Sequence, residues 1–232
     1  MSFGLHAAAL IATPLRRRGQ RAGLASVVVV GLCGVTYAAA ARRWGHRRSA
    51  ATLASLAVGT LAIEKIGVST GLPFGRYHYT SKLRPRIAGV PAIVPLAWFA
   101  MAVPSREVAR AITPAWRVPL GAALLTAWDL FLDPQMVGEG YWKWNRVGRY
   151  RGIPLTNFLG WAVTSCAVMA LLDTSLPVDE PVDATLVVEY GWMAFMQTLG
   201  FAVFFGDPVV AAVGGSAMLP PAFAALRSLT RP

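Results

Sequence analysis

The stretch from Leu24 to Ala41 reads LASVVVVGLCGVTYAAAA and contains no charged residue. Its length suits one helical crossing of a bilayer, which takes ~20 residues, and its apolar residues are continuous, unlike the alternating pattern of a membrane β-strand. Six similar charge-poor runs follow it, so the sequence predicts an all-α integral membrane bundle of about seven transmembrane helices. The seven runs are Leu24–Ala41, Ala50–Ile63, Ile87–Val103, Val118–Leu132, Ile153–Leu172, Ala184–Phe205 and Pro208–Leu226.

Two of these runs leave the number of spans open between six and eight. The second run is long enough only if its helix continues past Glu64 to Val68, and the fourth only if its helix begins near Trp116. A further short apolar stretch, Phe3–Leu15, precedes the first run. No segment between the runs could form a soluble domain, so we expect residues 1–232 to be a single polytopic membrane domain.

The composition supports a protein with little mass outside the membrane. Of the 232 residues, 55% are hydrophobic and 14% are charged, against ~25% charged in a typical soluble domain. The net charge is +11, but the basic residues lie in short loops between apolar runs, which indicates contact with anionic membrane lipids and no nucleic acid.

Loop charges also predict an orientation in the cell membrane. With seven spans, the amino-terminal segment and the second, fourth and sixth loops share one side and hold 13 Lys and Arg residues, against 9 on the other side. This bias places the amino terminus in the cytoplasm. The second and fourth loops lie on the same face whichever way the bundle is oriented.

The sequence offers no pattern for a metal or a disulfide. Cys33 and Cys166 each lie within an apolar run, which predicts two small core residues. His6, His46 and His78 lack the spacing of metal ligands. We therefore expect no metal and no cofactor.

The second loop combines a carboxylate with two tyrosines. Glu64 lies near the end of the second span, and residues Thr70–Thr80 (TGLPFGRYHYT) hold the glycines and proline of a compact turn. Tyr77 and Tyr79 alternate along it. Two interpretations remain: an interfacial loop with belt aromatics, or a loop that enters the protein and lines a cavity.

Asp129 and Asp133 are four residues apart, so on a helix they share a face. Pro134 is expected to end the fourth span at Asp133, next to the helix carboxyl end. A neighbouring like charge, partial desolvation and the helix dipole all favour a proton on one of them, as general-acid catalysis requires. The alternative is a structural carboxylate paired with an arginine. We expect Asp129, the deeper residue, to be the donor, with Glu64 as the reserve catalytic candidate.

Aromatic residues surround this pair in the sequence. Their π faces could stabilise a carbocation, although an interfacial aromatic belt explains the same composition. Asn157, at the start of the fifth span, is a polar group that could hold a water. The substrate-binding candidates are Tyr77, Tyr79, Trp128, Tyr141, Trp142, Trp144 and Asn157.

Five short segments resemble one family. Residues Thr70–Thr80, Gly89–Pro91, Pro95–Phe99, Ala127–Pro134 and Gly152–Trp161 resemble the signatures of the membrane-bound carotenoid biosynthesis proteins of the carotenoid 1,2-hydratase type. The resemblance implies addition of water to the terminal 1,2 double bond of an acyclic carotenoid end group, without a cofactor. It also implies a lipophilic carotenoid substrate within the bilayer, surrounding membrane lipids, and other carotenoid-pathway enzymes as partners.

Two other classes of protein remain as alternatives. A membrane prenyltransferase would use aspartates to hold magnesium on a pyrophosphate, but such enzymes need two aspartate-rich motifs and this chain has one pair. A transporter or scaffold would be expected to carry polar residues in the middle of several spans. The first, third, fifth and seventh runs contain no charge, which disfavours that alternative.

Overall fold

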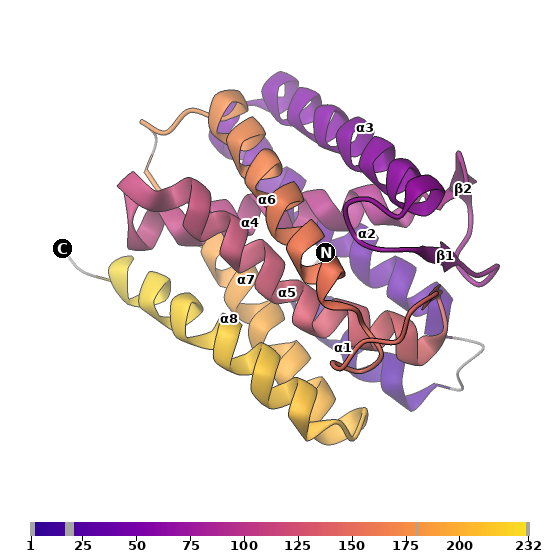
Figure 1. Cartoon of the computed structure of the whole chain (residues 1–232). Helices are drawn as coiled ribbons and strands as arrows, with labels where there is room; N and C mark the ends of the chain where they lie inside the picture. The colour runs from indigo at the N-terminus through magenta and orange to yellow at the C-terminus, as the bar shows by residue number, and fades with distance from the viewer. Residues whose placement is uncertain (1–2, 17–20, 180, 231–232) are drawn as a thin grey trace.

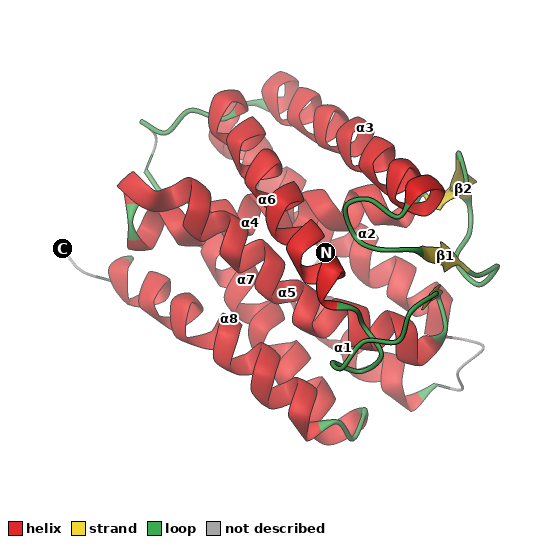
Figure 2. Ribbon diagram, viewed as in Figure 1, coloured by secondary structure: helices red, strands yellow, loops and turns green. Residues whose placement is uncertain are grey.

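The computed structural model describes residues 3–16, 21–179 and 181–230, which form an all-α bundle with four very short strands (Figures 1 and 2). Among these residues there are eight α-helices. They are α1 (Phe3–Leu15), α2 (Arg21–Trp44), α3 (His46–Thr70), α4 (Ile93–Ile112), α5 (Arg117–Glu139), α6 (Leu155–Ser175), α7 (Ala184–Leu199) and α8 (Pro208–Ser228). The short turns η2 (Pro114–Trp116) and η3 (Gly200–Phe204) precede α5 and extend α7.

Five helices in the described part of the chain are long and apolar enough to cross a membrane: α2, α3, α6, α8, and α7 together with η3. The chain is therefore a multi-pass membrane protein. These five helices correspond to the first, second, fifth, sixth and seventh predicted runs, and α1 has the bounds of the additional stretch Phe3–Leu15. The third and fourth runs form α4 and α5, which are not among the five.

α4 lies at the centre of the bundle, where it packs against α2, α3, α5, α6, α7 and α8. Every residue from Trp98 to Arg110 is buried, so the helix is enclosed on all sides. Its predicted start at Ile87 is wrong, because Arg86–Ile87 (β2) pairs with Val90–Pro91 (β3) in a hairpin before the helix begins. Its predicted end at Val103 is also too early.

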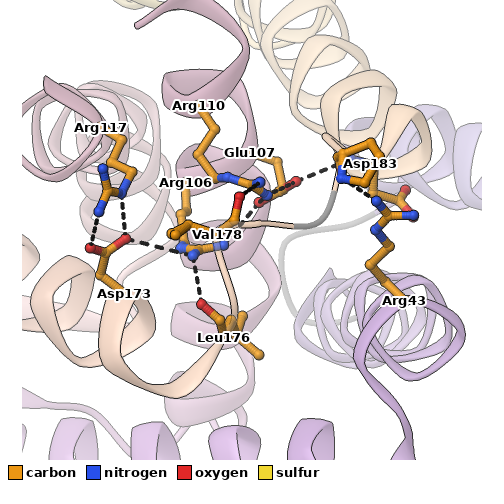
Figure 3. Close-up of polar contacts among 10 residues, drawn as sticks. Arg43, Arg106, Glu107, Arg110, Arg117, Asp173, Leu176, Val178 and Asp183 are labelled. Atoms are coloured by element: carbon orange, nitrogen blue, oxygen red, sulfur yellow. Dashed lines mark hydrogen bonds and ion pairs between the residues drawn. The ribbon is translucent and has the colours of Figure 1, made fainter. Parts of the chain in front are cut away.

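α4 continues beyond Val103 because its charged residues are paired inside the protein (Figure 3). Glu107 Oε1 lies 3.0 Å from Arg106 Nη1 and 2.7 Å from Arg110 Nη1. The two guanidinium groups also donate to the carbonyls of Leu176 and Val178, each at 2.8 Å. These contacts pair the buried charges and hold the loop after α6 against the end of α4.

α5 does not end before Pro134, as the sequence predicted, but continues to Glu139. A proline inside a helix has no N–H for the carbonyl four residues earlier, which here belongs to Leu130. The Tyr150 hydroxyl donates a hydrogen bond to that carbonyl at 2.8 Å. A side chain from the following loop thus replaces the missing donor, and the helix can continue.

The second and fourth loops meet at one end of the bundle (Figure 2). β1 (Tyr77–Tyr79) pairs antiparallel with β4 (Trp142–Trp144), so that Tyr77 lies opposite Trp144. The second loop also packs closely on α6 at Gly160, where an added Cβ would lie 2.8 Å from the backbone of Pro73. The expectation that these two loops share a face is confirmed by this pairing.

The outer surface of the spans is apolar, as contact with lipid requires. On α6, Leu159 and Val163 are exposed on the outside of the bundle. Cys166 is exposed at the next turn of this face, so its predicted core position is wrong. Cys33 is buried, as predicted.

Candidate active site

Asp129 and Asp133 lie side by side on α5 and are both buried. The side chain of Asn157, on the first turns of α6, lies between them. Its Nδ2 donates to Asp129 Oδ2 at 2.6 Å and to Asp133 Oδ2 at 2.5 Å. One amide group therefore fixes the relative position of the two carboxyl groups.

Glu64 is the third buried carboxyl group of the site and lies on the penultimate turn of α3. The hydroxyls of Tyr77 and Tyr79 both donate to its Oε2, the latter at 2.8 Å. The indole of Trp98, on α4, donates to its Oε1 at 3.4 Å. The two tyrosines reach the same carboxyl because alternate residues of a strand project to one side.

Burial and the neighbouring Glu64 raise the pKa of both Tyr77 and Tyr79. Both hydroxyls are therefore protonated across the physiological range and can donate to Glu64. Three hydrogen-bond donors from two elements thus converge on one carboxyl group.

One pocket connects two of the three carboxyl groups, Glu64 and Asp133. Glu64, Asp133 and Asn157 all line it, and its volume of ≈ 90 Å³ exceeds the 10–15 Å³ that one water requires. Most of the remaining wall is apolar or aromatic. It comprises Ala25, Ser26, Val29, Phe74, Tyr77, Tyr79, Leu83, Ile93, Val94, Ala97, Trp98, Trp128, Leu132, Met136, Tyr141, Trp142, Trp144 and Trp161. We call this cavity the inner pocket.

The predicted aromatic residues all lie on this wall. The ring of Trp144 lies 5.1 Å from that of Tyr77, and the ring of Trp142 meets Tyr79 edge to face at 5.7 Å. Trp128 and Tyr141 also line the pocket. The structure thus brings together the substrate-binding candidates, from both loops and from α5.

The sequence interpretation missed two tryptophans of the pocket. Trp98 and Trp161 stack with ring centroids 4.2 Å apart and planes 10° from parallel, and Trp128 meets Trp161 edge to face at 6.1 Å. Both lie within the segments that carried the family resemblance, which is the signal that could have identified them.

The charge environment of the site is simple. No lysine or arginine is among the residues that line the inner pocket. In the described ranges, no ion pair involves Glu64, Asp129 or Asp133, so pairing with an arginine does not account for these carboxyls. Among the residues that the structure describes, no group of three or more His, Cys, Asp and Glu is arranged so that it could hold a metal ion.

Fold and site together define a helical membrane protein with a carboxyl-lined, largely apolar pocket. Residues 23–227 match the family described as "Carotenoid biosynthesis protein", and the chain belongs to this family. It is also 29% identical over 134 residues to bisanhydrobacterioruberin hydratase from Haloarcula japonica, a match that covers 55% of this chain and 45% of that protein. The chain thus matches less than half the length of this curated relative. No solved structure matches the chain.

Proposed function

We propose that this protein hydrates the terminal 1,2 double bond of an acyclic carotenoid end group, by acid-catalysed addition of water without a cofactor. One observation carries the proposal: two differently hydrogen-bonded carboxyl groups, Glu64 and Asp133, line one aromatic pocket in a carotenoid biosynthesis protein. The name of the Haloarcula japonica relative supports hydration as the chemistry. A substrate soluble only in the bilayer also suits a protein built of membrane helices.

The hydrogen-bond partners assign different roles to the carboxyl groups. Glu64 accepts from three donors, an arrangement that suits an ionised carboxylate. Asp129 and Asp133 share a single amide, and two adjacent buried carboxyls without a cation favour holding one proton between them. The pair is therefore the proton source, and Glu64 is the base.

The reaction is balanced with these two groups. Asp133 gives its proton to C2 of the alkene, the π bond breaks, and a tertiary cation forms at C1. The faces of the pocket aromatics stabilise this cation. A water then bonds to C1 and loses one proton to Glu64, which yields a tertiary alcohol. Return of that proton to the Asp129–Asp133 pair restores the enzyme.

Two of these roles differ from those that the sequence suggested. Asp129 was the expected donor because it is deeper, but Asp133 lines the inner pocket and Asp129 does not. We therefore assign the donor to Asp133 and treat Asp129 as its partner. Asn157 was expected to hold a water, whereas its Nδ2 is engaged by the two carboxyls, so we assign it a positioning role.

We further propose that α4 and α5 also cross the membrane, which gives seven spans, α2 to α8. At 1.5 Å per residue, their 20 and 23 residues extend about 30 and 35 Å, enough for a hydrocarbon core of ~30 Å. The 13 residues of α1 extend only about 20 Å. With the amino terminus in the cytoplasm, the paired second and fourth loops close the site on the cytoplasmic side.

The direct test is pigment analysis in a bacterium that produces an acyclic carotenoid. Expression of this protein should add the mass of one water per modified end, as measured by chromatography and mass spectrometry. Asp133→Asn and Glu64→Gln should each lower product formation by about 10²–10⁴-fold, the typical value of general acid–base catalysis. Asp173→Asn, a change at a carboxylate paired with Arg117 outside the site, is the matched control. Unmodified pigment with well-expressed wild-type protein would refute the proposal.

A further inference from the structure

A second cavity adjoins the inner pocket, and we call it the outer chamber. Its volume is ≈ 80 Å³. It is lined from α1, α2, α5, α7 and η3 by Ile11, Thr13, Ala25, Val28, Val29, Leu32, Trp128, Leu132, Gln135, Met136, Met193, Met196, Gln197, Gly200, Phe201, Phe204 and Phe205. The two larger cavities elsewhere in the described structure share no lining residue with the inner pocket.

The inner pocket and the outer chamber are separated only by residues that line both. These are Ala25 and Val29 on α2, and Trp128, Leu132 and Met136 on α5. The four-residue spacing places each set along one face of its helix. In the described structure α2 and α5 are not close-packed neighbours, because each packs mainly against other helices. The two cavities thus share one wall, which is formed by these two helix faces.

The outer chamber reaches the surface of the bundle at α1 and η3. Ile11 and Phe204 line the chamber and are each 38% exposed. Every residue that lines the inner pocket is buried or half-buried. The chamber therefore lies between the exposed Ile11 and Phe204 and the wall that it shares with the inner pocket, which Asp133 and Glu64 line.

We propose that the outer chamber binds the segment of the substrate's hydrocarbon chain next to its end group, while the end group lies in the inner pocket. This inference rests on the proposed function. The inner pocket has room for only a few atoms, so the rest of a long carotenoid must leave it, and the outer chamber is the adjoining apolar space. Three of its lining residues, Met136, Met193 and Met196, are flexible and polarisable side chains that adapt to an extended ligand.

The test narrows the chamber and compares two substrates. Met196 is buried in the chamber wall and is not part of the inner pocket, so Met196→Trp should obstruct the chain. Ile11→Trp at the mouth is a second obstructing variant. Phe195→Trp is the matched control, because Phe195 is adjacent in sequence but 51% exposed.

Purified proteins would be assayed with a full-length acyclic carotenoid and with a short alkene that has the same terminal isopropylidene group and no polyene. Each obstructing tryptophan should displace two or three methylene groups of the substrate chain from the chamber. The ratio of the rate with the long substrate to the rate with the short one should therefore fall by roughly 10- to 60-fold in Met196→Trp and Ile11→Trp. Phe195→Trp should keep the wild-type ratio. An unchanged ratio in a folded obstructing variant would overturn the inference, and if Met196→Trp fails to fold, Ile11→Trp decides.

A second measurement separates this inference from the proposed function. The amount of carotenoid that remains bound to each purified variant is measured by its absorbance per protein. If wild-type protein hydrates neither substrate, the proposed function fails, but weaker retention by the obstructing variants still supports the chamber as the binding site of the chain. Equal retention by all variants, as expected if a lipid acyl chain fills the chamber, overturns it.

Discussion

Replacement of Asn157 by leucine tests whether the carboxyl pair is a positioned proton source. Leucine has a similar size but cannot donate, so Asn157→Leu removes both hydrogen bonds that fix Asp129 and Asp133. The helix α6 should still form, because Asn157 is buried by packing and its neighbours stay in place. The change therefore acts on the geometry of the pair and spares the rest of the pocket.

The two lost hydrogen bonds determine the size of the effect on the rate. With one proton on the pair, one lost bond goes to a charged group, worth ~1.5–3 kcal/mol, and the other to a neutral group, worth ~0.5–1.5 kcal/mol. The loss amounts to roughly 2–4.5 kcal/mol, or about 30- to 2000-fold in rate. This loss should appear in kcat, because the misplaced donor matters in the transition state. KM should change little, because the aromatic wall and the outer chamber are untouched.

The assay is the steady-state rate of carotenoid hydration by purified Asn157→Leu, with thermal unfolding measured on the same sample. Asn145→Leu, the same change at an exposed asparagine of the loop before α6, is the control and should keep the wild-type kcat. A folded Asn157→Leu protein that retains more than about a tenth of kcat would refute the positioning role. A loss confined to KM would instead indicate direct binding of substrate by Asn157.

Three further predictions address topology, metal dependence and stability. In a cysteine-free background, His78→Cys and Lys143→Cys should label from the same side of the membrane, because the two residues are partners in the β1–β4 ladder; labelling from opposite sides would contradict the shared site. Hydration should persist in EDTA, whereas a strict magnesium requirement would favour a prenyltransferase. Glu107→Gln should lower the free energy of unfolding by roughly 3–5 kcal/mol, because it removes the buried carboxylate that pairs with both Arg106 and Arg110. The exposed Arg151–Asp207 pair is the comparison, and Arg151→Gln should cost at most about 1 kcal/mol in thermal unfolding assays.

Hydropathy predicted where helices lie better than where they begin and end. Continuous apolar runs correspond to α2, α3, α6, α7 and α8, because lipid contact requires apolar side chains along the whole span. The end of α4 was misplaced because Arg106 and Glu107 are paired inside the bundle, and hydropathy counts them as solvent-exposed. The end of α5 was misplaced because the Tyr150 hydroxyl compensates for Pro134, a contact between separate elements that local sequence does not show.

The composition of the site was also partly predictable. The four-residue spacing of Asp129 and Asp133 predicted a shared helix face, and loop parity predicted that the second and fourth loops meet. Trp98 was missed because it lies in the middle of an apolar run, where a tryptophan has no local pattern that separates a pocket wall from ordinary core packing. Its contact with Glu64 depends on how α3 and α4 cross.

The division of labour among the carboxyl groups depends on donors that are distant in sequence. Glu64 is surrounded by hydroxyl and indole donors from β1 and α4, whereas Asp133 shares one amide of α6 with Asp129. Asp129 lies one turn earlier on α5 and does not line the pocket, although it is fully buried and shares the face of Asp133. Depth along a helix therefore predicts burial, but access to substrate depends on where the pocket lies. For this reason we place the proton donor at Asp133, the carboxyl group of the pair that the pocket leaves uncovered.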